Sequence, residues 1–203
     1  MMLRRRGEHG ALGNMRVPWQ MHDDAAAADP CRDAVDQRRH LVAVMNMRIE
    51  IALRGNPRNA HAAHIRGHLH YELGEREEGL AFLKAWAKGY PRDGMLHCHV
   101  SWHQAIWSLE TGRREDAWRI YASDLPPGGS WGPPLNVLTD CASFLARAEM
   151  AGERIEPDLW RAISRYAGQW FPNSGMIFAD MHSALAFAMA GDGDALRSLI
   201  DSP

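Results

Sequence analysis

The segment HCHVSWHQAIWSLETG, residues 97–112, decides the fold. Its apolar residues recur at the spacing of one helical face, and it ends in a glycine, the residue best able to close a helix C-terminus. Two of its histidines, His99 and His103, are four positions apart and therefore share one face of that helix. Helix-then-glycine segments of the same kind recur before and after it. The sequence therefore predicts an all-α protein.

Turn glycines recur along the chain at an almost constant spacing. Gly74, Gly112, Gly152 and Gly191 are 38, 40 and 39 residues apart. A fixed period of about that length is typical of an α-solenoid, in which each helix–turn–helix unit buries its apolar face against its neighbours. The expected helices cover residues 33–54, 58–73, 76–88, 95–111, 114–123, 135–151, 157–170, 174–190 and 194–200.

Residues 1–33 lack this periodicity and mix arginine, glycine, histidine and methionine, so we expect a disordered or poorly packed N-terminal segment. The helical repeat domain is expected to cover residues 34–203. Its first helix has no predicted unit before it, and an uncapped apolar face there would favour self-association.

Composition excludes several classes of protein. The chain is 46% hydrophobic and 24% charged, as in ordinary globular proteins, and its net charge of -2 gives no indication of a nucleic-acid or membrane-surface partner. No apolar run approaches the roughly 18 residues of a membrane-spanning helix, and the arginines at positions 4–6 precede no apolar signal segment. We therefore expect a cytoplasmic protein, and no cofactor is predicted.

Six short motifs carry a resemblance to a known family. They are His61-Ala-Ala-His64, Glu78-Gly-Leu-Ala-Phe-Leu83, His99-Val-Ser-Trp-His103-Gln-Ala-Ile106, Leu109-Glu110-Thr-Gly112, Asp140-Cys-Ala-Ser-Phe-Leu145 and Phe178-Ala-Asp180-Met-His182. In this order and spacing they resemble the tetratricopeptide repeat protein 38-like family over about residues 49–200. The resemblance implies a superhelix of tetratricopeptide repeat (TPR) type and no particular activity. Residues 1–48 match the N-terminal half of that family poorly.

Histidines are concentrated on the first helix of the predicted units. When the units are aligned on their turn glycines, His61 and His99 occupy one equivalent position, and His103 and His182 occupy another. The first helices of a TPR-type superhelix line its concave surface, so these side chains would face one groove. The predicted groove residues are His61, His64, His68, Glu72, His99, Trp102, His103, Glu110, Asp140, Ser143, Asp180 and His182.

Three interpretations of these histidines stay open at this point. They can be structural residues that hydrogen-bond neighbouring helices, or they can line a groove that binds a protein segment, a peptide or a small ligand. Alternatively, the histidines can hold a transition metal, with His64, His68, His99 and His103 as ligands, in a metal-dependent hydrolase. No HExxH motif is present. The prediction is therefore a binding module with no catalytic residue and no metal assigned, and the hydrolase is the alternative.

Overall fold

A computed structural model describes residues 30–129 and 131–202, with side chains from residue 37 onward. All nine regular elements in this part of the chain are α-helices, which confirms the all-α prediction. The chain divides into two units, Met1–Leu41 and Val42–Pro203. The first helix, α1 (Pro30–Gly55), spans this boundary. The segment expected to be disordered covers residues 1–33, and its residues 1–29 lie outside the described residues.

The helices of the second unit begin and end within three residues of their predicted bounds. They are α2 (Ala60–Leu73), α3 (Arg76–Ala87), α4 (His97–Glu110), α5 (Arg114–Asp124), α6 (Pro134–Met150), α7 (Pro157–Trp170), α8 (Ile177–Ala190) and α9 (Gly193–Ile200). Among these helices and α1, none is long and apolar enough to cross a membrane.

The turn glycines end the helices for a conformational reason. Gly74, Gly112, Gly152 and Gly191 have φ values of 75°, 77°, 89° and 74°, which lie in the left-handed region. A side chain strains the backbone there, whereas glycine does not. At the other end of α2, the side chain of Asn59 accepts a hydrogen bond from the Ala62 N–H, as an N-cap residue does.

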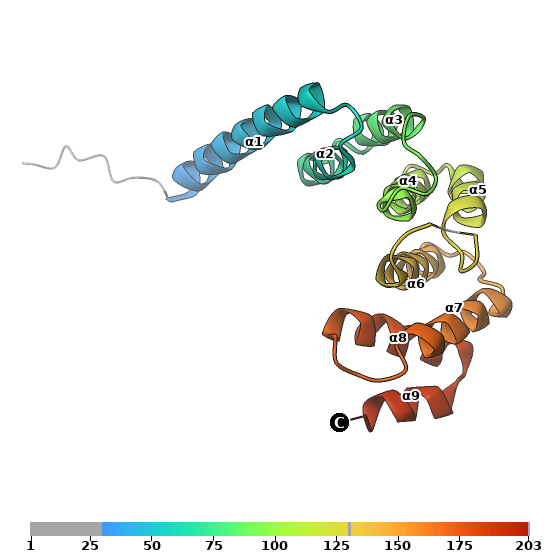
Figure 1. Cartoon of the computed structure of the whole chain (residues 1–203). Coiled ribbons are helices and arrows are strands. Elements are labelled where there is room, and N and C mark those ends of the chain that lie inside the picture. The colour runs from blue at the N-terminus through green and yellow to red at the C-terminus, as the bar shows by residue number, and fades with distance from the viewer. Residues whose placement is uncertain (1–29, 130, 203) are drawn as a thin grey trace, which may run out of the picture. The chain divides into compact units, whose positions relative to one another are not determined.

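Helices of the second unit pack in an alternating order. Each of α2, α4, α6 and α8 contacts the helix that follows it in sequence. In addition, α4 contacts α3, and α8 contacts α7. Contacts further join α4 to α6 and α6 to α8, so these helices follow one another along one side, with α3, α5 and α7 on the other (Figure 1).

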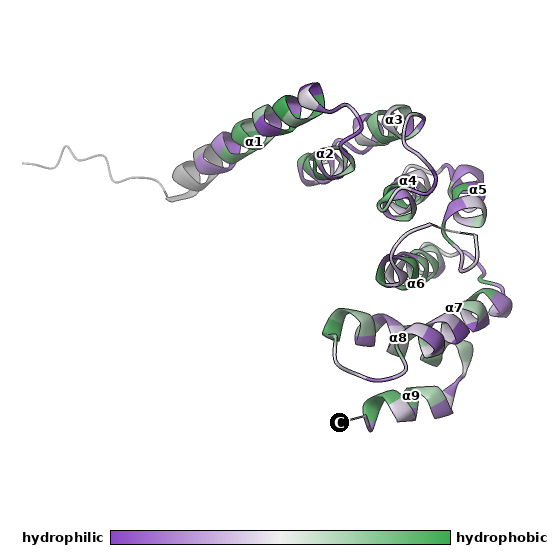
Figure 2. Ribbon diagram, viewed as in Figure 1, coloured by the Kyte–Doolittle hydropathy of each residue, from purple (hydrophilic) through white to green (hydrophobic). Residues whose placement is uncertain are grey.

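A continuous hydrophobic core holds these layers together. Its largest fully buried side chains are Trp107, Phe144, Leu83, Leu125, Leu138, Leu145 and Ile163. Each helix also carries hydrophilic residues (Figure 2), as expected where one face of a helix is buried and another meets water. At the start of α8 this separation fails, because two apolar side chains meet water: Ile177 is 80% exposed and Phe178 is 55% exposed.

Candidate metal centre and adjacent pockets

Two helices bring four imidazole rings together. His64 and His68 are one turn apart on α2, and His99 and His103 are one turn apart on α4. Each ring offers one nitrogen as a possible metal ligand, and these four nitrogens all lie within 4.8 Å of one another. We call these four residues the histidine cluster. His103 is buried, His64 and His99 are partly buried, and His68 is exposed, so the histidine cluster is open to solvent on one side.

The Nε2 atoms in the histidine cluster are too close to be satisfied by protons alone. His64 Nε2 lies 2.8 Å from His68 Nε2 and 3.0 Å from His99 Nε2. A ring nitrogen of a neutral imidazole has either one proton or one lone pair, so His64 Nε2 can make one good hydrogen bond of the two. His103 Nε2 is buried and has no hydrogen-bond partner. A metal ion satisfies such a set because it accepts a lone pair from every ring.

A buried carboxylate lies behind one ring of the histidine cluster. His99 Nδ1 is 2.9 Å from Asp140 Oδ1, and Asp140 is 3% exposed. The thiol of Cys98 donates to the other carboxylate oxygen at 3.6 Å. A proton on Nδ1 of His99 therefore pairs with Asp140 and leaves the Nε2 lone pair facing His64. Carboxylates fix the tautomer and the orientation of metal-binding histidines in this way.

Burial favours the neutral form of three members of the histidine cluster, His64, His68 and His103. It lowers the pKa of His103 to about 2, and the neighbouring His99, His64 and His68 act in the same direction. Burial, followed by His99, His68 and His61, lowers the pKa of His64 to about 4. The pKa of His68 is also lowered, again chiefly by burial. Neutral imidazole is the form that binds metals, so these three side chains are ready to act as ligands at pH 7.

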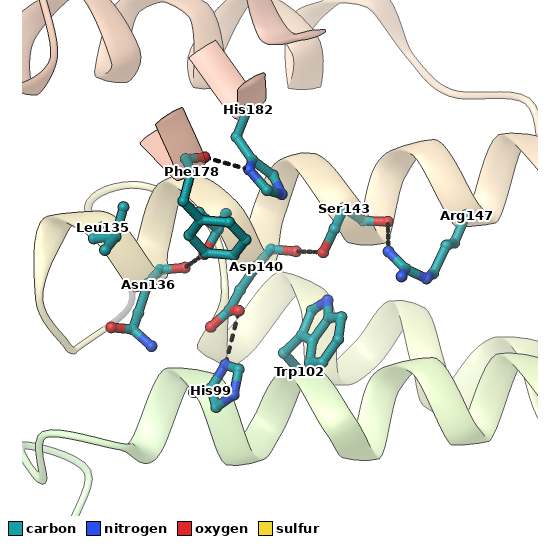
Figure 3. Close-up of a pocket in the computed structure, with 10 residues that line it drawn as sticks. His99, Trp102, Leu135, Asn136, Asp140, Ser143, Arg147, Phe178 and His182 are labelled. Atoms are coloured by element: carbon teal, nitrogen blue, oxygen red, sulfur yellow. Dashed lines mark hydrogen bonds and ion pairs between the residues drawn. The ribbon is translucent and has the colours of Figure 1, made fainter. Parts of the chain in front are cut away.

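A cavity of about 220 Å³ opens on the Asp140 side of His99. Its walls come from α4, α6 and α8, and Figure 3 shows Trp102, Ser143, Arg147 and His182 around it. The ring of His182 is fixed because Nδ1 donates to the carbonyl oxygen of Phe178 at 2.7 Å. We call this cavity the α8 pocket. It combines aromatic surface with hydrogen-bonding side chains, as small-ligand sites do.

A second cavity, of about 160 Å³, lies against the histidine cluster itself. His68 and His103 form part of its wall, and Trp102 and Arg147 line both this cavity and the α8 pocket. Its remaining lining residues are Tyr71, Ile106, Trp107 and Glu110. We call it the cluster pocket.

The predicted groove residues separate into several groups in the structure. Four form the histidine cluster, Asp140 supports it, and Trp102, Ser143, Glu110 and His182 line one or both pockets. His61 and Glu72 are exposed on α2 and line neither pocket, although Glu72 interacts electrostatically with His68. Asp180 accepts a hydrogen bond from the Gly175 N–H at 3.1 Å and lines neither pocket.

Eight lining residues were missing from the predicted groove residues: Tyr71, Ile106, Trp107, Leu135, Asn136, Thr139, Arg147 and Phe178. Arg147 lies one helical turn after Ser143, and its guanidinium carbon is 5.6 Å from the centre of the Trp102 ring. The turn-by-turn spacing from Ser143 was a signal that could have identified it. Phe178 was noted only as part of a motif, and its exposure of 55% beside the α8 pocket is apparent only in three dimensions.

Comparison with known proteins adds no family: no family model matches this chain. No solved structure matches it either.

Proposed function

We propose that this protein binds a divalent transition-metal ion, with His64, His68, His99 and His103 as the ligands. One observation carries the proposal: two pairs of histidines, with the members of each pair one helical turn apart, bring four ring nitrogens within 4.8 Å of one another. Helical proteins build metal sites from side chains that facing helices project into a common space.

The distances support a metal of zinc size. Two nitrogen ligands on a tetrahedral zinc ion, each 2.0–2.1 Å from the metal, lie about 3.3 Å apart. The closest pairs in the histidine cluster are 2.8 Å and 3.0 Å apart, and the widest separation is within 4.8 Å. The spacing expected for zinc ligands therefore lies within the range of separations found in the histidine cluster.

The donor set favours a particular group of metals. Imidazole nitrogen suits zinc, copper, nickel, cobalt and iron, whereas magnesium and calcium prefer oxygen ligands. Asp140 is placed to orient His99 and to offset part of the metal's charge from outside the first shell. We therefore propose zinc, or a divalent ion of similar chemistry, as the occupant.

At the level of the fold we propose a TPR-type solenoid with a period of about 39 residues. Two features support this proposal. The four left-handed glycines recur at nearly constant spacing, and α4, α6 and α8 pack on one another in succession. In such an array the histidine cluster would lie on the helices that face the concave side.

A second candidate function is the binding of a small ligand or peptide in the predicted groove, and the α8 pocket is the observation that favours it. The pocket assembles His99, Asp140, Ser143 and His182 from three helices that are far apart in sequence. The hydrolase alternative would require, in addition, a water molecule on the metal. Its direct test is whether added zinc produces hydrolysis of an activated ester.

Metal content is the decisive measurement. The tag-free protein, purified without chelator, should hold close to one equivalent of metal by mass spectrometry, and the chelator-stripped protein should take up one equivalent of zinc. The double variant His99→Ala/His103→Ala should lose this uptake while remaining helical by circular dichroism.

His61→Gln provides a matched control, because His61 is exposed on α2 one turn before His64 and is outside the histidine cluster. This variant should bind zinc like the unmodified protein. Unmodified protein that takes up no zinc, or a double variant that takes up as much as the control, would overturn the proposal.

A further inference from the structure

The cluster pocket has the shape and polarity to hold a small molecule against the metal. His68 and His103 form one wall, so a ligand in the pocket lies next to the ion that these residues would hold. His68 is the exposed member of the histidine cluster, so this is also the side on which the metal is accessible. Zinc can expand from four ligands to five when a further donor arrives.

Most of the pocket wall is apolar. Trp102, Ile106 and Trp107 contribute ring and aliphatic surface, and Trp107 is 1% exposed, so this wall is rigid. A volume of about 160 Å³ suits a small molecule rather than a peptide. The walls therefore favour a compact ligand with an aromatic or aliphatic body.

Charge in and around the pocket favours an anion. Arg147 donates to the Ser143 carbonyl oxygen at 3.3 Å and has no carboxylate partner in the part of the chain that the structure describes. Glu110 also lines the pocket, and its carboxylate forms an ion pair with Arg76 at 2.8 Å. A divalent ion on four neutral imidazoles adds two positive charges, and the carboxylate of Asp140 lies behind His99 rather than in the cluster pocket.

We infer that the cluster pocket binds a small organic carboxylate, with its apolar body against Trp102 and its carboxylate held by Arg147 and the metal. Arginine and carboxylate form paired, charge-assisted hydrogen bonds, and a carboxylate oxygen is an acceptable fifth donor to zinc. This inference rests on the proposed metal site and adds the chemical class of its ligand.

Benzoate is the probe that tests it, because it joins a carboxylate to a flat apolar ring. Isothermal titration calorimetry of the zinc-loaded full chain should detect benzoate binding at least about tenfold tighter than that of benzamide, which has a similar shape and no charge. Acetate, which lacks the ring, should also bind more weakly. In the cobalt-loaded protein, benzoate should reduce the visible absorption bands, as expected when a four-coordinate ion becomes five-coordinate.

Variants assign the contacts. Arg147→Gln should weaken benzoate binding by about tenfold or more without changing zinc uptake. Arg147→Lys should retain only part of the benzoate affinity of the unmodified protein. Arg161→Gln is the matched control, because Arg161 lies on α7 and pairs with Asp158 away from both pockets.

Each failure points to a different step. Benzamide that binds as tightly as benzoate, or Arg147→Gln protein that keeps full benzoate affinity, overturns the carboxylate assignment. Equal benzoate affinity with and without zinc overturns the part assigned to the metal. Protein that takes up zinc but binds no benzoate refutes this inference alone, whereas protein that takes up no zinc refutes the proposed function as well.

Discussion

His99 is shared between a carboxylate and the histidine cluster: its Nδ1 lies 2.9 Å from Asp140 Oδ1, and its Nε2 lies 3.0 Å from His64 Nε2. One ring therefore links the buried acid of α6 to the imidazoles of α2. The acid fixes which nitrogen of His99 has the proton, and thereby which nitrogen is free for a metal.

Replacing this acid should weaken metal binding without removing a ligand. We expect Asp140→Asn to lower zinc affinity by about 10–100-fold, as removal of an outer-shell carboxylate does in other metal sites. Competition with a chelating dye measures the change. Asp180→Asn is the matched control, because Asp180 bonds to the Gly175 backbone and lies outside both pockets. Equal zinc affinity in the two variants would show that Asp140 is a structural residue only.

Metal binding should stabilise the fold, because the ion binds the folded chain. At a free zinc concentration of 100 times the dissociation constant, linkage predicts about 2.7 kcal/mol of added stability. For a chain of this size, that corresponds to a rise of roughly 5–11 °C in the apparent melting temperature. Differential scanning fluorimetry measures it, and the His99→Ala/His103→Ala variant should show no rise. An equal rise in that variant would place the zinc elsewhere.

The order of metals is itself a test of the donor set. Four imidazoles should bind cobalt more weakly than nickel, and nickel more weakly than copper, with zinc weaker than copper. Magnesium and calcium should not compete with zinc even at millimolar concentration, because both prefer oxygen ligands. Competition titrations against one chelating dye give the whole series. Displacement of zinc by calcium would mean that carboxylates, not histidines, form the site.

The metal-free protein should lose stability as the pH falls below about 6.5, because His103 is buried in its neutral form. Its pKa is about 2 in the folded state, against 6.5 in the unfolded chain. Between these values the unfolded state binds one more proton, so the free energy of unfolding decreases by about 1.4 kcal/mol per pH unit as the pH falls. Above pH 6.5 His103 is neutral in both the folded and the unfolded chain, so it adds no pH dependence there.

Urea denaturation at pH 7, 6 and 5 measures the pH dependence of stability. His103→Gln should flatten it, since glutamine does not titrate, while His64 and His68, whose pKa values are also lowered, keep part of the slope. A His103→Gln variant with an unchanged slope would show that His103 is not buried in the neutral form.

Helix positions could be predicted from sequence because they depend on local signals. Apolar spacing marked the faces, and Gly74, Gly112, Gly152 and Gly191 marked the ends through a backbone conformation that glycine adopts without strain. Pro157 did the same for the start of α7, whereas α6 begins at Pro134, one residue before its predicted start.

The stagger between neighbouring helices could not be predicted in this way. Alignment on the turn glycines makes His61 the equivalent of His99, yet the structure places His64, one turn later, beside His99. Repeat equivalence describes positions within a unit, whereas contacts between units depend on how side chains on one helix fit between those on the next. The alignment therefore paired His99 with His61, which lies outside the histidine cluster, and not with His64.

Close packing of α2, α3 and α4 can be tested with a pair of glycines. A Cβ atom on Gly79 would lie 2.8 Å from His70 Cβ and 2.9 Å from the Trp107 ring, so Gly79→Ala must displace a buried indole. We expect this variant to lose about 1–3 kcal/mol of stability, the usual cost of overpacking.

Gly168 provides the matched comparison, because it lies within α7 and a Cβ atom there meets nothing within 4 Å. Alanine has the better helix propensity, so Gly168→Ala should gain about 0.5–1 kcal/mol. Urea denaturation of both variants measures the difference. Since Trp107 packs against His103 at 5.9 Å between ring centres, Gly79→Ala should also weaken zinc binding, whereas Gly168→Ala should leave it unchanged. Two variants of equal stability would mean that α3 does not approach α4 as closely as the structure places it.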